Sequence, residues 1–206
     1  MPASPDRSYR RTERLLGTFV TIEVVSHPDD GPDPVAAFDR AFEWVQAVER
    51  CCSRFDPESE LRRLGAVAGT PVRVSRMLFD ALQFAVVLAG DTGGAFDPTV
   101  GDEMAARGFN RHHLTGQLAH PDGGGDPAGL GQPPTYRDIT FDPDTQSVTV
   151  SHPLTLDLGA VAKGLAIDLA VCALGDFPHV TIDAGGDLYL RGSRPDGGPW
   201  SVGIRH

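Results

Sequence analysis

The stretch Asp157–Asp168 reads DLGAVAKGLAID and carries the clearest structural signal in the chain. The alternating apolar residues Leu154 and Leu156 precede it, so Asp157 stands where a strand would end. Helical periodicity then predicts a helix over Ala160–Leu174. The stretch therefore predicts a turn that leads from an extended segment into a helix.

This turn has two interpretations. The first turn of a helix presents unpaired N–H groups and a partial positive charge, which suit a phosphate. Lys163 adds a full positive charge, while Gly159 and Gly164 let a ligand approach the backbone closely. The alternative is an ordinary strand-to-helix turn with an exposed lysine. The turn alone does not separate an anion site from a purely structural turn.

Standard nucleotide-binding motifs are absent. Gly159 and Gly164 have the spacing of P-loop glycines, but the lysine precedes the second glycine and no Ser or Thr follows it. No G-x-G-x-x-G motif opens a helix after a strand, which argues against a Rossmann site. His112 and His113 lack a spaced third metal ligand, so we interpret them as residues of a glycine-rich, mobile surface loop.

Hydrophobic periodicity predicts clusters of strands separated by helices. Strands are expected at Leu15–Val25, Val72–Val74, Ile139–Phe141, Ser147–Val150, His179–Asp183, Leu188–Arg191 and Trp200–Ile204. Asp33 and Ser75 are expected to cap two further helices, and Ser59 a short helical turn. The pattern predicts an α+β fold in which helices pack on antiparallel sheets.

Composition narrows the class of protein. The formal net charge of −10 argues against nucleic-acid binding, and no apolar run approaches the length of a membrane span. The three cysteines do not form a disulfide framework. No signal peptide or lipid-attachment cysteine is evident, so we expect a cytoplasmic protein. Residues 1–14 are expected to be a disordered tail before one domain over 15–206.

Four more segments break the periodic pattern with small or charged residues. They are Leu16–Thr18, Ser53–Leu61, Thr92–Thr99 and Asp183–Asp187. Each has an ordinary reading, for example a bulge at Gly17 or a hairpin at a Gly-Gly pair. Together with the Asp157–Asp168 stretch, which holds Lys163, they supply aromatic rings, acids, a glycine-lined approach and a lysine. These are the parts that hold a dinucleotide, and carboxylate oxygens also suit a metal ion.

Taken in order, these segments resemble the ApbE family, the FAD:protein FMN transferases. The resemblance rests on the motifs LGT, SRFDPESEL, TGGAFDPTVG, LDLGAVAKGLAID, IDAGGDLYLRG and WSVGI. It implies an α+β, T-fold-like architecture that binds FAD with Mg²⁺. It also implies an enzyme that transfers FMN to a threonine of an acceptor flavoprotein and releases AMP.

The resemblance assigns site residues position by position. The implied FAD-contacting positions are Leu16, Phe55, Ala95, Phe96, Asp97, Asp157 and Lys163. The backbone carbonyl of Ala160 is the implied Mg²⁺ ligand, and the catalytic residues are not identified. Leu16 stands where the family usually has methionine, and Phe55 where it often has tyrosine.

The sequence departs from the family pattern in two places. Gly65 occupies a position where the family commonly has asparagine. The chain also ends at His206, whereas family members continue into a segment with further Mg²⁺ ligands, so a C-terminally truncated transferase domain is expected. The alternatives are a non-catalytic FAD-binding module and a degenerate structural relative that binds no flavin.

Overall fold

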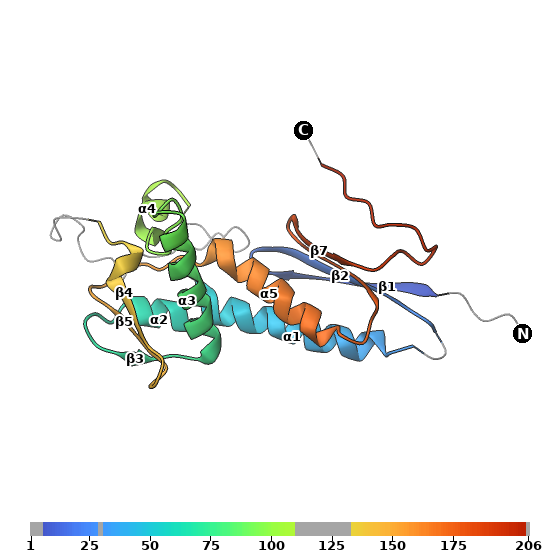
Figure 1. The fold of residues 1–206 in the computed structure, drawn as a ribbon, viewed down its shortest axis with the longest axis horizontal. Helices are drawn as coiled ribbons and strands as arrows, with labels where there is room; N and C mark the ends of the chain where they lie inside the picture. Colours follow the sequence, from blue (N-terminus) through green and yellow to red (C-terminus); the bar gives the residue numbers. More distant parts are fainter. Residues whose placement is uncertain (1–5, 29–30, 110–132, 205–206) are drawn as a thin grey trace, which may run out of the picture. The chain divides into compact units, whose positions relative to one another are not determined.

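A computed structural model describes residues 6–28, 31–109 and 133–204. The chain forms two compact units, Met1–Ala47 with Lys163–His206, and Val48–Ala162 (Figure 1). Within the described ranges, no helix is both long and apolar enough to cross a membrane. The three cysteines are free thiols, as their number and spacing predict.

The first unit is built on a four-stranded antiparallel sheet in the order β1-β2-β6-β7. These strands are β1 (Arg7–Leu15), β2 (Thr18–Ser26), β6 (His179–Ala184) and β7 (Asp187–Arg191). One face is apolar and buried, because alternate side chains of a strand point to the same side. Its buried residues include Val20, Ile22, Val24, Val180 and Ile182. Two helices run along one side of this sheet within the unit (Figure 1). They are α1 (Pro34–Cys52), up to Ala47, and α5 (Gly159–Ala173), from Lys163.

Strand β1 corrects the interpretation of residues 7–14 as part of a disordered tail, while residues 1–5 lie outside the described residues. Its nine residues pair with β2 along their full length, from Arg7 opposite Ser26 to Leu15 opposite Thr18. The strand has too few apolar residues to show a period of two. Long polar side chains replace them: the Arg11 guanidinium lies 5.1 Å from the centre of the Phe42 ring. The alkyl stem of such a residue covers apolar surface without a hydrophobic signal in the sequence.

The turn between β1 and β2 lies inside the strand expected at Leu15–Val25. Leu16 has a φ of 52° and Gly17 a φ of 74°. Two central residues with positive φ are the mark of a tight type I′ hairpin turn. Gly17 therefore permits a hairpin, and the alternative of a bulge is wrong. Leu16 adopts a left-handed conformation that leucine seldom takes.

The second unit contains a three-stranded antiparallel sheet in the order β3-β5-β4. The strands are β3 (Val72–Arg73), β4 (Ile139–Asp142) and β5 (Ser147–Val150). Helix α3 (Arg76–Asp91) packs on it, and the rings of Phe79 and Phe141 meet edge to face at 5.4 Å. The predicted hairpin at Asp142 is confirmed.

The predicted helix caps are confirmed. The Asp33 carboxylate accepts the Val35 N–H at 2.9 Å at the start of α1. The hydroxyl of Ser59 accepts the Arg62 N–H at the start of α2 (Glu60–Gly65), and that of Ser75 accepts the Leu78 N–H at the start of α3. Caps are predictable because donor and acceptor lie within one helical turn of each other.

Two other expectations need correction. Residues 101–106 form helix α4 (Gly101–Ala106) where the sequence suggested loop, and the 3₁₀ turn η2 (Tyr136–Asp138) precedes β4. His112 and His113 lie outside the described residues. Trp200–Ile204 forms no strand; the Trp200 indole N–H donates to the Arg191 carbonyl at 3.1 Å, and Ile204 is exposed. The segment alternates correctly but pairs with no strand among the described residues.

Candidate functional site

Two glycine-bearing turns lie side by side at one end of the strands of the first sheet. Because β2 pairs with β6, with Val20 opposite Ala184, the turn at Leu16–Gly17 neighbours the turn at Gly185–Gly186. The approach is close: a Cβ on Gly185 would lie 2.4 Å from Oγ1 of Thr18. The φ of Gly185 is +69°, which also favours glycine. We call these two turns the glycine edge.

Lys163 belongs to the same edge. Its Nζ lies 3.5 Å from Oδ2 of Asp187, the residue that follows the Gly185–Gly186 turn. The lysine side chain is 37% exposed, so this ion pair is weak and leaves the ammonium group accessible. The structure therefore gathers two predicted FAD positions, Leu16 and Lys163, at the glycine edge of the first unit.

In the second unit, a buried arginine connects two predicted FAD positions. The Arg54 Nε lies 3.1 Å from Oδ2 of Asp157, and the guanidinium carbon lies 4.4 Å from the centre of the Phe55 ring. The Arg54 and Asp157 side chains are only 10% and 16% exposed. We call Arg54, Phe55 and Asp157 the arginine cluster. Arg54 lies within the SRFDP motif, but no pattern in the sequence indicated a role for it.

Asp157 is also fixed by the backbone on both sides. Its Oδ1 accepts the Gly159 N–H at 2.7 Å, at the first residue of α5. Its own N–H donates to the Pro98 carbonyl at 2.8 Å. The latter bond joins the Ala95–Thr99 loop to the arginine cluster. Residues 153–158 form no strand, so the strand end expected at Asp157 is wrong: an irregular segment leads into α5, and these hydrogen bonds fix it.

The predicted positions Ala95, Phe96 and Asp97 occupy that loop. Ala95 is exposed and Phe96 is partly exposed, while both oxygens of the Asp97 carboxylate are engaged. Oδ1 accepts the Thr99 N–H at 3.0 Å and its hydroxyl at 2.7 Å, and Oδ2 accepts the Tyr136 N–H at 2.9 Å. Asp97 therefore shapes the loop. Direct contact of Ala95, Phe96 or Asp97 with FAD stays a prediction.

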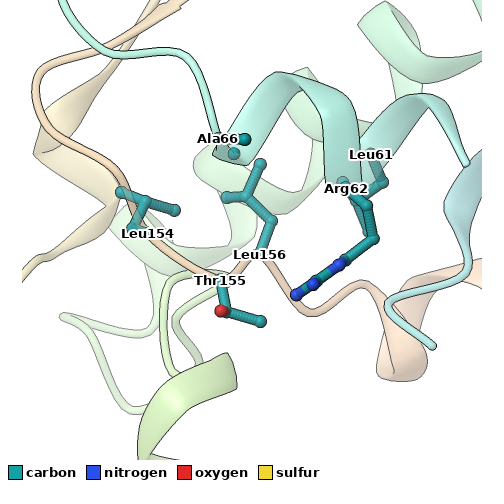
Figure 2. Close-up of a pocket in the computed structure, with 7 residues that line it drawn as sticks. Leu61, Arg62, Ala66, Leu154, Thr155 and Leu156 are labelled. Atoms are coloured by element: carbon teal, nitrogen blue, oxygen red, sulfur yellow. The ribbon is translucent and has the colours of Figure 1, made fainter. Parts of the chain in front are cut away.

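A small hollow lies beside α2 (Figure 2). Its cavity volume is only about 30 Å³, and it is lined by Leu61, Arg62, Gly65, Ala66, Leu154, Thr155 and Leu156. Gly65 explains one departure from the family pattern. Its carbonyl accepts the Leu154 N–H at 3.0 Å, and a Cβ at this position would lie 2.4 Å from the Leu154 carbonyl oxygen. A side chain such as asparagine does not fit here without movement of the backbone.

The donor set for a metal ion is incomplete. Among residues 6–28, 31–109 and 133–204, no three His, Cys, Asp or Glu side chains gather as metal ligands. Ala160 lies in the first turn of α5, and its carbonyl is the one ligand that the resemblance implies. Magnesium requires six oxygen ligands in near-octahedral geometry. The described residues therefore do not form a magnesium site by themselves.

The family model of the ApbE family matches residues 16–206. The chain belongs to the ApbE family. Its members at known structure include the flavin transferase ApbE from Vibrio cholerae, with a TM-score of 0.81 and 25% identity over 97% of this chain and 64% of that one. The ApbE protein from Thermotoga maritima gives a TM-score of 0.79 and 26% identity, with the same coverage. These similarities confirm the α+β fold.

Curated ApbE relatives carry the name FAD:protein FMN transferase. The Treponema pallidum protein is 31% identical over 221 residues, which cover 97% of this chain and 58% of the relative. The Rhodobacter capsulatus protein is 32% identical, with 98% of this chain and 38% of the relative covered. The chain thus spans less than two thirds of the length of these relatives.

Proposed function

We propose that this ApbE chain is an FAD:protein FMN transferase that moves FMN from FAD to a threonine of an acceptor flavoprotein and releases AMP. The observation that carries the proposal is the turn into α5. There Asp157 is locked by Arg54 and Gly159, and Lys163 follows within the same helix with an accessible ammonium group. The family motif LDLGAVAKGLAID and these contacts fall in the same stretch of the chain.

The proposed reaction is a substitution at phosphorus. The threonine hydroxyl oxygen forms a bond to the phosphorus of the FMN half, the bridging P–O bond breaks, and AMP leaves with the bridging oxygen. The hydroxyl proton passes to a base or to solvent. A cation close to the diphosphate stabilises the charge that grows on the leaving group. We assign that part to Lys163, whose side chain is 37% exposed.

The remaining predicted positions divide by task. Leu16 and Phe55 supply apolar surface for the flanks of the flavin or adenine rings. Ala95 and Phe96 contact FAD from the loop whose conformation Asp97 fixes through its hydrogen bonds with Thr99 and Tyr136. Asp157 is the acid that binds FAD, held in place from both sides.

Mg²⁺ is the ion that the resemblance implies, and when bound it would act as a Lewis acid on phosphoryl oxygen. Ala160 is its one candidate ligand in the described part of the chain, and no step is assigned to the ion. A titration of FAD binding with and without MgCl₂ measures whether this chain uses the ion at all.

The test combines the purified chain, FAD, Mg²⁺ and a flavin-accepting domain. Covalent FMN on the acceptor, seen as fluorescence on a denaturing gel, and an equal amount of AMP support the transferase. An acceptor with its target threonine replaced by valine is the control. FAD binding without AMP or covalent FMN contradicts the transferase and identifies an FAD-binding module. No FAD binding at all identifies a structural relative.

A further inference from the structure

Arg54 makes three different contacts in a buried setting. Its Nε pairs with Asp157 at 3.1 Å, its Nη2 donates to the Phe109 carbonyl, and its guanidinium plane lies over the Phe55 ring. A planar guanidinium can make the ion pair, the hydrogen bond and the ring contact at once, which an ammonium group cannot. One side chain thus fixes the relative positions of an acid, an aromatic ring and a backbone carbonyl.

The geometry is not what folding stability alone would select. The Nη1 of Arg54 is buried and has no hydrogen-bond partner among the residues that the structure describes. An unpaired buried donor is unfavourable unless a water molecule or a ligand satisfies it. A buried ion pair is also weak evidence for stability, because desolvation opposes the attraction between the charges. The cluster therefore points to a role in placing its partners.

The side chains that Arg54 contacts belong to two predicted FAD positions of the second unit, Phe55 and Asp157. Asp157 in turn accepts the N–H of Gly159, so its orientation is tied to the start of α5. Removal of Arg54 would free both the carboxylate and the ring from their common anchor. A change at Arg54 is thereby transmitted to two positions predicted to touch the ligand.

We propose that Arg54 is a positioning residue of the FAD site, which orients Asp157 and Phe55 for binding without contacting FAD itself. The inference rests on the proposed function, because it concerns residues assigned to FAD there. It adds a residue that neither the family resemblance nor the sequence pattern assigned to the site.

The experiment measures FAD affinity by quenching of flavin fluorescence, with thermal melting recorded for every variant. Arg54→Met is expected to weaken FAD binding about tenfold, since loss of a group that orients a ligand-binding residue has effects of this order. Arg54→Lys keeps the charge but not the planar contacts, so we expect an intermediate affinity. Arg76→Met is the matched control: this exposed arginine pairs with Asp80 on α3, and no change in affinity is expected.

A variant cycle that includes both partners separates positioning from an independent contact. Because Arg54 acts through Asp157 and Phe55, adding Arg54→Met to the Asp157→Asn, Phe55→Ala variant should not weaken FAD binding further. Multiplicative losses overturn the inference. Equal FAD affinity of wild type and a folded Arg54→Met also overturns it, and leaves the proposed function intact.

Two further outcomes are decisive. If Arg54→Met does not fold, Arg54→Lys takes its place, and an affinity equal to that of wild type overturns the inference. A wild-type chain that does not bind FAD overturns the proposed function and this inference together. The wild-type measurement therefore distinguishes failure of the function from failure of the positioning role.

Discussion

The backbone N–H of Tyr136 donates a hydrogen bond of 2.9 Å to Oδ2 of Asp97, although 39 positions separate the two residues. The hydroxyl oxygen of Thr99 lies 2.7 Å from Asp97 Oδ1 and 3.0 Å from the Pro134 carbonyl oxygen, so its single proton is shared between two acceptors at the same junction. The Asp97-Pro98 pair, which reads as ordinary turn chemistry, therefore joins two distant segments of the second unit. Its carboxylate is a structural centre of the loop that carries Ala95 and Phe96.

We expect Asp97→Asn to destabilise the protein. The asparagine amide NH₂ cannot accept the hydrogen bonds that one carboxylate oxygen accepts, so at least one backbone N–H loses its partner. The free energy of unfolding should fall by about 1–3 kcal/mol, the usual effect of an unsatisfied buried donor. Urea denaturation measures it, with Asp91→Asn at an exposed position as the control. An unchanged midpoint would show that the junction is held by other contacts.

Gly185→Ala tests the close approach at the glycine edge. A methyl group there meets Thr18 Oγ1 at 2.4 Å and forces alanine to a φ of +69°. Gly186→Ala shares the positive φ, at +101°, but has no atom within 4 Å of the added Cβ. Both should destabilise, by about 1–3 kcal/mol for the backbone strain alone, and Gly185→Ala should lose more. Thermal or urea unfolding gives the difference, which isolates the clash with Thr18; equal losses would argue against it.

Asp138 makes stability depend on pH at the acid end. Burial raises the pKa of its carboxyl, but the Thr135 backbone N–H and the Ser151 hydroxyl outweigh burial, so the pKa lies below the ordinary value. A depressed folded pKa contributes stability above the unfolded pKa of about 3.9, and this stability is lost as the pH falls through the folded value. Asp138→Asn should therefore flatten the decline of stability below about pH 4.

The measurement for Asp138 is a series of urea unfolding curves between neutral and acid pH. Asp176→Asn, at an exposed position after α5, serves as the control. If the free energy of unfolding of Asp138→Asn falls with decreasing pH as steeply as that of the wild type, other carboxylates cause this loss of stability.

Lys163 is the residue that we propose to meet the diphosphate. Lys163→Ala should weaken FAD binding more than Lys163→Arg, because arginine keeps the positive charge and binds phosphate well. Asp187→Asn is the accompanying variant, since it removes the 3.5 Å ion pair while the lysine remains. Flavin fluorescence titrations compare all three. Equal effects of Lys163→Ala and Lys163→Arg on FAD affinity would show that this side chain does not bind the phosphates.

Local features of the fold could be predicted from the sequence, and features that depend on distant partners could not. Ser59 and Ser75 cap helices because their partners lie within three residues, and the β4–β5 hairpin follows from its turn residues. Strand β1 was not predicted because the alkyl stems of long polar side chains such as Arg11 cover the core in place of apolar residues. The strand expected at Trp200–Ile204 had the right alternation, but a strand also needs a neighbour.

The candidate site shows the same division. The motifs identified Phe55 and Asp157 one at a time, and no pattern in the sequence indicated that a single arginine contacts both. Gly65 stands where the family commonly has asparagine, and the structure shows backbone packed against backbone at this position. Such relationships arise from tertiary packing, which short-range patterns do not encode.

Leu16 keeps a bulky apolar side chain at a hairpin tip where its φ of 52° favours asparagine or glycine. A search for thermostable variants alone would converge on one of these smaller residues. Because we propose that Leu16 lines the flavin site, a search for tight FAD binding would retain leucine or a comparable hydrophobe. The two selections act in opposite directions at this single position, so a library randomised there would reveal which of them shaped the chain.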